Sequence, residues 1–257
     1  RDLLCSNGSL TVKYSDCHAL LEDGRRAGVG AKYSLFLAAN GDLWAWGFNP
    51  GLFADGKDPG SSNVPRLIGS GYSGVAAGAN HIMALKDGLL WGWGINRKGQ
   101  IGDGTIQNAL MPKLIGAGYV AVSAGYDHTL ALKFDGTVWA WGRNNLGQLG
   151  DQSDVDSLVP KKVTGLSNVI SIQASYFGSY ALTSSGELFG WGRAEVGTVG
   201  GSTSSPVRIG GGFSGFAVGE THALAIKAAE VWAWGSNTAG QLGGNLAFST
   251  WPVPTNT

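Results

Sequence analysis

The chain has little charge, almost no sulfur and no long apolar stretch. Of its 257 residues only 14% are charged, and 18 Lys and Arg residues balance 18 Asp and Glu residues. A net charge of zero gives no long-range attraction to nucleic acids or to anionic membranes. No apolar run approaches the roughly 18 residues of a membrane-spanning helix. We therefore expect neither a nucleic-acid partner nor insertion into a membrane.

Only two cysteines are present, Cys5 and Cys17. They lie close together in the sequence, and a disulfide between them would indicate an oxidising compartment. Two buried thiols are the alternative. The pair favours an extracellular or cell-surface location, or the periplasm, over the cytoplasm.

Glycine and tryptophan are abundant by contrast, with 43 and 10 residues. The glycines show no Gly-x-y period, which excludes collagen, and they indicate many tight turns between short strands. Trp-Gly pairs recur at intervals of 47, 48, 50 and 43 residues, which is typical of a repeat architecture. The tryptophans of these pairs are Trp46, Trp93, Trp141, Trp191 and Trp234.

One repeat is clearest in residues 124–151, AGYDHTLALKFDGTVWAWGRNNLGQLGD. HTLAL and VWAWG alternate with period two around an Asp-Gly turn, so they predict a β-hairpin. Both Trp residues of VWAWG share one face, which suits packing of one sheet on the next. NNLGQLG predicts a sharp corner whose Gln bonds to loop backbone. The Pro-containing segment that follows suits an edge strand, and small-residue segments such as GVAAG suit a crowded position near an axis.

A unit of about 45 residues with four short strands is typical of a propeller blade. We therefore predict an all-β fold, a β-propeller of about five four-stranded blades over residues 27–257. The segment from Ala27 is interpreted as starting midway through a blade, and STWPVP (249–254) as beginning a new one. The N- and C-terminal strands would then join and close the ring; a fragment of a longer array is the alternative. Residues 1–26 lie outside the repeat and are expected to form a cap or a junction.

The repeated phrase resembles the repeat of the regulator of chromosome condensation family, over about residues 27–257. Propellers of that family commonly have seven blades, whereas this chain has five copies. The resemblance implies function through loops on one propeller face. Known members include an exchange factor for a small GTPase that also binds chromatin, and a secreted bacterial inhibitor of β-lactamases. The neutral charge and the cysteine pair favour a secreted, bacterial member over a nuclear one.

Positions that vary between the copies are the candidates for binding. The residues just before the second strand of each repeat should form one loop per blade on a common face, and several are aromatic, as interface anchors often are. A second variable set follows each Trp-Gly pair; ordinary solvated loops are the alternative for it. The candidate rim residues are Lys32, Tyr33, Asn80, Tyr126, Asp127, Tyr176, Phe177, Glu220, Arg143 and Arg193.

Three copies carry histidine at one aligned position, as His81, His128 and His222. A ring of histidines invites a metal hypothesis. Two copies lack the histidine, however, and no Cys or carboxylate occupies a matching position. We therefore interpret these histidines, like the repeated tryptophans, as structural, and expect neither a metal nor a cofactor.

Catalytic motifs such as HExxH, Gly-x-Ser-x-Gly and a phosphate-binding Gly-Lys-Ser/Thr are absent from the sequence. The leading hypothesis is a non-enzymatic protein–protein interaction module, for example an extracellular adhesin or a pilus-tip domain. The alternatives are a guanine-nucleotide exchange factor for a small GTPase and a secreted inhibitor of an enzyme such as a β-lactamase. A propeller enzyme is disfavoured by the small apolar residues expected near the axis.

Overall fold

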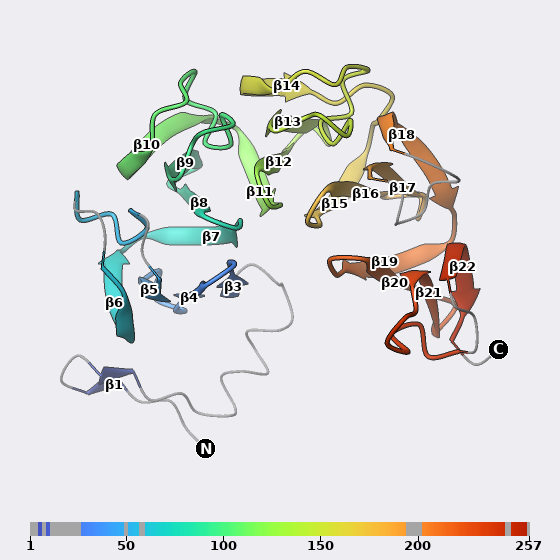
Figure 1. Cartoon of the computed structure of the whole chain (residues 1–257), viewed down its shortest axis with the longest axis horizontal. Helices are drawn as coiled ribbons and strands as arrows, with labels where there is room; N and C mark the ends of the chain where they lie inside the picture. The colour runs from blue at the N-terminus through green and yellow to red at the C-terminus, as the bar shows by residue number, and fades with distance from the viewer. Residues whose placement is uncertain are drawn as a thin grey trace.

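The computed structural model describes residues 5–6, 9–10, 27–48, 51–56, 60–193, 202–244 and 248–255. Its regular structure is all β, and within these residues no helix is long and apolar enough to cross a membrane. Five antiparallel four-stranded sheets follow one another along the chain (Figure 1). The prediction of an all-β fold with about five four-stranded blades is confirmed.

Each sheet is a meander of strands that are consecutive in sequence. The strands are β3 (Ala27–Val29), β4 (Tyr33–Leu37), β5 (Leu43–Gly47) and β6 (Ser62–Gly69) in the first sheet; β7 (Tyr72–Ala77), β8 (His81–Lys86), β9 (Leu89–Gly94) and β10 (Ala109–Ala117) in the second; β11 (Tyr119–Ala124), β12 (His128–Lys133), β13 (Val138–Gly142) and β14 (Ser157–Lys162) in the third; β15 (Val169–Ala174), β16 (Gly178–Thr183), β17 (Leu188–Gly192) and β18 (Thr203–Gly210) in the fourth; and β19 (Phe213–Val218), β20 (His222–Lys227), β21 (Glu230–Ser236) and β22 (Phe248–Pro254) in the fifth. A separate pair, β1 (Cys5–Ser6) and β2 (Ser9–Leu10), forms a two-stranded sheet. Cys17 lies outside the described residues, so the disulfide stays a prediction.

The predicted closure of the ring by joined terminal strands is wrong. β22 pairs with β21 and β3 pairs with β4, each within its own sheet. STWPVP is therefore the outermost strand of the last sheet, and Ala27 begins the innermost strand of the first. Figure 1 shows the five sheets along an arc, with the first and last at its two ends.

The order of strands from the centre of the arc to its periphery follows the residue types. The first strand of each sheet lies toward the centre in Figure 1, and the small-residue segments occupy these strands. The fourth strands lie outermost and contain Pro65, Pro112, Pro160, Pro206 and Pro252. An outer edge needs no N–H donor, so proline costs little there. Both expectations, small residues near the axis and proline at the edge, are confirmed.

The second Trp of the repeat packs between neighbouring sheets. Trp141 is fully buried and clusters with Met83 and Leu90 of the second sheet. Its indole Nε1 donates to the carbonyl oxygen of Gln100 at 3.0 Å. The indoles of Trp93 and Trp191 donate in the same way to carbonyls of the sheets before them, and Trp234 is also buried. Trp46, in the first sheet of the arc, is only half-buried.

The glycine after this Trp is required by the backbone. Gly142 has a φ of 98°, in the region that favours glycine. A Cβ at Gly142 would lie 2.5 Å from the carbonyl oxygen of Asp127, which is closer than atoms can approach. The recurrence of Trp-Gly therefore has a packing cause and a conformational cause, neither of which involves a ligand.

Candidate functional site

The two variable loop sets lie at the same end of the sheets. His128, at the start of β12, pairs with Gly142, at the end of β13, so the loops next to these residues leave the sheet together. The same register recurs in the other four sheets. The loops before the second strands and after the third strands therefore form one surface, which we call the loop face.

A cavity of about 590 Å³ opens at the loop face, where the innermost loops of the sheets converge. Backbone hydrogen bonds join these loops: Ala31 N donates to Ala79 O, and Tyr126 N donates to Tyr176 O, both at 3.1 Å. Most of the lining is small residues, and its ionisable side chains are Tyr126, Tyr176 and Glu220. The cavity mouth is thus a rigid rim with two tyrosines and one carboxylate.

Three aromatic rings and two guanidinium groups gather beside this cavity. The ring centroids of Tyr126 and Tyr176 lie 4.2 Å apart, and Phe177 meets Tyr176 edge-on at 4.5 Å. The guanidinium carbons of Arg143 and Arg193 lie 5.7 and 5.6 Å from the Phe177 centroid, within cation–π range. We call these five residues the aromatic–arginine cluster. Aromatic residues and arginine are the types enriched at the centres of protein interfaces.

Asp127 ties this cluster to the scaffold. Its Oδ1 accepts a hydrogen bond from Gln100 Nε2 at 2.9 Å, and its Oδ2 lies 3.8 Å from Arg143 Nη1. Burial raises the pKa of the Asp127 carboxyl, while the positive charges of Arg143 and Lys98 oppose that rise. Partial burial, a hydrogen bond with Tyr126 and the carboxylates of Glu220 and Asp127 raise the pKa of Tyr176 to about 12. Tyr176 therefore stays neutral at physiological pH.

Phe177 occupies the place in the fourth sheet that Asp127 occupies in the third. Gln148 likewise corresponds to Gln100, but the buried Nε2 of Gln148 has no hydrogen-bond partner in the described part of the chain. A buried polar group without a partner costs about 1–3 kcal/mol. The fourth sheet therefore has a half-exposed aromatic ring at Phe177, and the buried amide of Gln148 lacks the carboxylate that Gln100 binds in the sheet before.

The remaining rim candidates are spread more widely. Lys32 and Glu220 are exposed on the loop face, and Asn80 is half-buried there. Tyr33 does not reach the rim: its side chain is buried, and its hydroxyl lies 2.9 Å from the carbonyl oxygen of Gly78 and 2.7 Å from that of His81. Burial raises the pKa of the Tyr33 hydroxyl well above its ordinary value. Tyr33 shares its repeat position with the histidines, which was the signal for a buried residue.

His81 and His128 make hydrogen bonds between sheets. His81 Nε2 lies 3.0 Å from Thr129 Oγ1, and Thr129 Oγ1 donates to the carbonyl oxygen of Gln100 at 2.8 Å. Because that hydroxyl has a single hydrogen, Nε2 of His81 must be the donor. His128 meets Ser179 Oγ in the same way at 3.1 Å.

These two histidines are held in the neutral form. Burial, helped by the charge of His128, lowers the pKa of His81 to about 3, and burial lowers the pKa of His128 to about 4. His222 in the last sheet is half-buried. Within the described residues no group of three or more His, Cys, Asp or Glu side chains could hold a metal ion.

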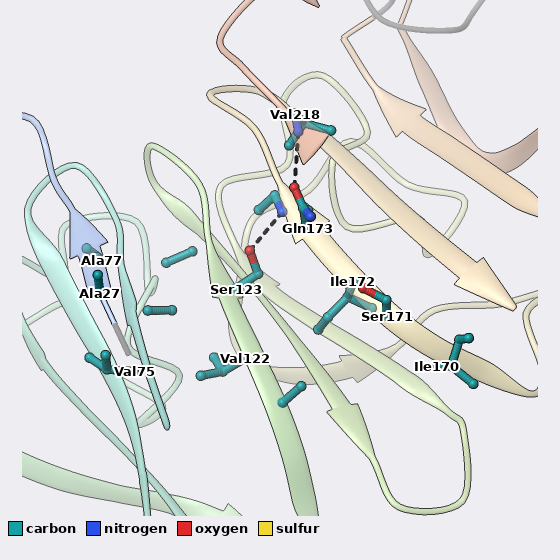
Figure 2. Close-up of a pocket in the computed structure, with 15 residues that line it drawn as sticks. Ala27, Val75, Ala77, Val122, Ser123, Ile170, Ser171, Ile172, Gln173 and Val218 are labelled. Atoms are coloured by element: carbon teal, nitrogen blue, oxygen red, sulfur yellow. Dashed lines mark hydrogen bonds between the residues drawn. The ribbon is translucent and has the colours of Figure 1, made fainter. Parts of the chain in front are cut away.

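A second cavity of about 390 Å³ lies further along the innermost strands (Figure 2). Its polar side chains connect sheets: Ser123 Oγ accepts from Ala174 N at 2.9 Å, and Gln173 Nε2 donates to Phe216 O at 2.8 Å. The Oε1 of Gln173 accepts from Val218 N at 3.1 Å, so this side chain bridges β15 and β19. The lining includes no ionisable side chain among the described residues.

The repeated Gln has two roles, one for its side chain and one for its backbone carbonyl, and the sequence predicted only the first. The expected bond to loop backbone is confirmed, because Gln100 and Gln148 each accept a hydrogen bond from the backbone N–H two residues earlier, at 2.8 Å. Their backbone carbonyls also receive the indole and hydroxyl donors of the next sheet. Thr129, Ser179 and Gln173 were not predicted. The only signal for Thr129 and Ser179 was their place directly after the aligned histidine position.

These features define a propeller-type scaffold of four-stranded sheets that carries variable loops on one face. Residues 87–132 and 135–182 match a family model described as the regulator of chromosome condensation (RCC1) repeat, and residues 119–148 match a second model with the same description. The matches support an RCC1-type repeat family. No curated protein sequence matches the chain significantly.

Several solved structures share the fold. Human WBSCR16 is 23% identical with a TM-score of 0.78, covering 90% of this chain and 66% of its own. Prp20p from Saccharomyces cerevisiae is 22% identical with a TM-score of 0.79, covering 96% and 67%. Yeast RCC1 (Prp20) in a complex with Kap60 is 22% identical with a TM-score of 0.79, covering 100% and 68%. The chain thus spans about two thirds of the length of each structure, and the similarity establishes the fold.

Proposed function

We propose that the chain is a non-enzymatic protein–protein interaction module whose loop face binds the partner. The observation that carries this proposal is the aromatic–arginine cluster, because side chains from four loops in two sheets converge beside one cavity. Tyr and Arg anchors with a rigid surround are the composition expected of an interface centre. The backbone bonds between the innermost loops hold the rim in place before binding, which lowers the entropic cost of association.

The similar structures support a protein partner. Prp20p has binding properties toward Gsp1p and histones, and yeast RCC1 (Prp20) was solved bound to Kap60. The expectation of a secreted, adhesive protein stays a prediction, since Cys17 of the proposed disulfide lies outside the described residues. The expectation of a bacterial member also stays a prediction, since the similar proteins WBSCR16 and Prp20p are from human and yeast.

The proposal is tested by affinity capture from an extract of the source organism. The test variant is the double substitution Tyr126→Ala and Tyr176→Ala. The matched control is Phe134→Ser, which removes an aromatic ring that is 80% exposed at the opposite end of the third sheet. The wild type and the control should capture the same proteins. The amount of each that the double variant captures should be about tenfold lower, as expected when hot-spot residues are truncated. Equal capture by the double variant, or loss with Phe134→Ser, would place the binding surface elsewhere.

Exchange of guanine nucleotide on a small GTPase is a second candidate. It is favoured by the structural similarity to Prp20p, which binds Gsp1p. Release of labelled GDP from a panel of purified small GTPases measures it directly. Acceleration of release by catalytic amounts of the chain would replace the non-enzymatic proposal, whereas binding without acceleration would support it.

A further inference from the structure

The cavity at the loop face has one charged side chain in its lining, among the described residues. This side chain belongs to Glu220, in the exposed loop before β20, whereas neither arginine of the aromatic–arginine cluster lines the cavity. The Glu220 carboxylate has no hydrogen bond or ion pair within the described part of the chain. A single unpaired carboxylate at the mouth of a cavity gives that mouth a negative potential, which attracts cations.

The two tyrosines of the rim lie in the same negative field. The ring centroids of Tyr126 and Tyr176 are 4.2 Å apart, and both residues line the cavity. Partial burial is the largest cause of the raised pKa of Tyr176, and the negative charges of Glu220 and Asp127 add to it. Tyrosine rings also attract cations through their faces. Carboxylate and rings together suit a basic side chain.

The rim is incomplete beside Glu220. Backbone hydrogen bonds join the innermost loops of the first four sheets in order, from Ala31 N to Ala79 O, from Ala79 N to Tyr126 O and from Tyr126 N to Tyr176 O. The next bond of the series would join Tyr176 N to Glu220 O, and these two described residues make no such bond. One backbone donor and one backbone acceptor therefore lack a partner here, and a peptide segment is the kind of ligand that supplies both.

The cavity is apolar away from this mouth. Its lining there includes Ala77, Ala124, Ala174 and Val218, which also line the second cavity (Figure 2). We call these four residues the apolar shaft. The volume of about 590 Å³ is in the range of ligand-binding cavities and leaves room for more than one side chain. An apolar side chain that neighbours the basic one therefore has a place to pack.

We propose that the cavity receives a basic side chain, lysine or arginine, from a segment of the protein partner. The cationic head pairs with Glu220 and lies against the rings of Tyr126 and Tyr176, while an apolar neighbour packs in the apolar shaft. The backbone of the segment supplies the partners that Tyr176 N and Glu220 O lack. The inference rests on the proposed function of the loop face and adds the chemistry of the partner.

Arg193 restricts where the basic head can lie. Arg193 and Glu220 line a smaller pocket between the fourth and fifth sheets, which adjoins the cavity. Like charges repel, so we expect the head on the cavity side of Glu220, among the tyrosines, and not beside Arg193.

The first test selects ligands without assuming a partner. A random dodecapeptide phage library is panned on the full chain, with counter-selection on Glu220→Gln, which removes the charge and keeps the size of the side chain. Peptides specific for the wild type should contain Lys or Arg beside an apolar residue. The matched control is Glu230→Gln, because Glu230 is an exposed carboxylate at the opposite end of the same sheet. That control should bind the selected peptides as the wild type does.

A double-mutant cycle on one synthetic peptide from this set then tests the contact, with affinities from calorimetry. Glu220→Gln should weaken binding about three- to fivefold, the upper range for an exposed ion pair. Once the basic residue of the peptide is replaced by Gln, Glu220→Gln should have no further effect, because the two residues are coupled. Tyr176→Leu should weaken binding about two- to fivefold, and Tyr176→Phe, which keeps the ring, should lose less.

Each remaining outcome rejects a defined part of the proposal. Wild-type-specific peptides that are acidic, or a cycle in which the two changes are additive, would overturn the basic partner and leave the loop face as the binding surface. Equal losses with Glu220→Gln and Glu230→Gln would show a general effect of charge and reject the site. If no basic peptide is selected but choline raises the unfolding midpoint of the wild type and not of Glu220→Gln, the site binds a small cation instead. Normal capture of partners by the Tyr126→Ala and Tyr176→Ala variant would make the proposed function fail independently.

Discussion

The indole nitrogen of Trp141 donates a hydrogen bond to the backbone carbonyl of Gln100, across the seam between the second and third sheets. The same carbonyl accepts from the Thr129 hydroxyl, which in turn accepts from His81. One backbone oxygen therefore joins three repeated side chains from two sheets. This arrangement is repeated at Gln148 with the next sheet, so the phrase that recurs in the sequence describes the seam rather than a binding site.

Replacing the indole at this seam should destabilise the protein strongly. Trp141→Ala should lower the free energy of unfolding by about 3–5 kcal/mol, since it removes a fully buried side chain. Trp141→Phe keeps much of the packing but loses the donor to Gln100, and should cost about 1–2 kcal/mol. Urea unfolding followed by far-UV circular dichroism measures both. Trp46→Phe is the matched control, because the half-buried Trp46 should tolerate the change; an equal cost at both positions would contradict the seam model.

The buried histidines should make stability depend on pH. Their pKa values of about 3 and about 4 in the folded state lie below the ordinary value of 6.5. As the pH falls below 6.5, His81 and His128 bind protons in the unfolded chain but not in the folded protein. Their contribution to stability is therefore complete above that pH and declines toward pH 4. The expected slope is roughly 1.4 kcal/mol per pH unit for each histidine.

Unfolding midpoints measured between pH 7 and pH 5 test this dependence, because most carboxyl groups titrate below that window. The control is the double variant His81→Gln and His128→Gln, which keeps a side-chain N–H donor but does not titrate. Its midpoint should change much less than that of the wild type across the window. A flat wild-type profile, or the same slope in both proteins, would show that these histidines do not govern acid stability.

Giving the fourth sheet the aspartate that the third sheet has at this position should stabilise the fold. Phe177→Asp supplies a carboxylate for the buried Gln148 Nε2, as Asp127 does for Gln100 Nε2. The gain should be about 1 kcal/mol, the size of a net hydrogen bond. Denaturant unfolding should rank Phe177→Asp above the wild type and Phe177→Ala below it. The reverse change, Asp127→Ala, should destabilise the fold because it leaves Gln100 Nε2 without its acceptor. Equal stability of the Asp and Ala variants at position 177 would refute the equivalence of positions 127 and 177.

The repeat predicted the strands and their order because its constraints are local. Alternation marks the hairpins, Gly142 marks a backbone that no other residue fits, and proline marks the outer edge. The phase of the repeat was predicted wrongly. The short strand at Ala27 has few residues and no distinctive side chain, so its pairing with β4 could not be distinguished from a start midway through a blade.

The candidate site was predicted as a set of varying positions, and their grouping came only from the structure. Tyr126, Phe177 and Arg193 converge because the loops of two sheets leave the same end of the arc. Sequence alignment of the repeats could reveal that Phe177 aligns with Asp127, but not that the Nε2 of Gln148 is left without a hydrogen-bond partner in the described part of the chain. Such a consequence depends on a contact between sheets, which a single repeat does not contain.

The Gln173 side chain should control how firmly the last sheet is attached. It donates to Phe216 O and accepts from Val218 N, and so bridges β15 and β19 (Figure 2). Gln173→Leu keeps the size of the side chain but leaves two backbone groups of β19 without partners, which should cost about 2 kcal/mol or more. Hydrogen exchange should accelerate at Val218 and along β19 while exchange in the second and third sheets stays unchanged, because local openings differ in free energy across a structure. Ser171→Ala, on the same strand and lining the same cavity, is the matched control. If exchange at β19 is unaffected by Gln173→Leu, packing rather than this amide holds the fifth sheet.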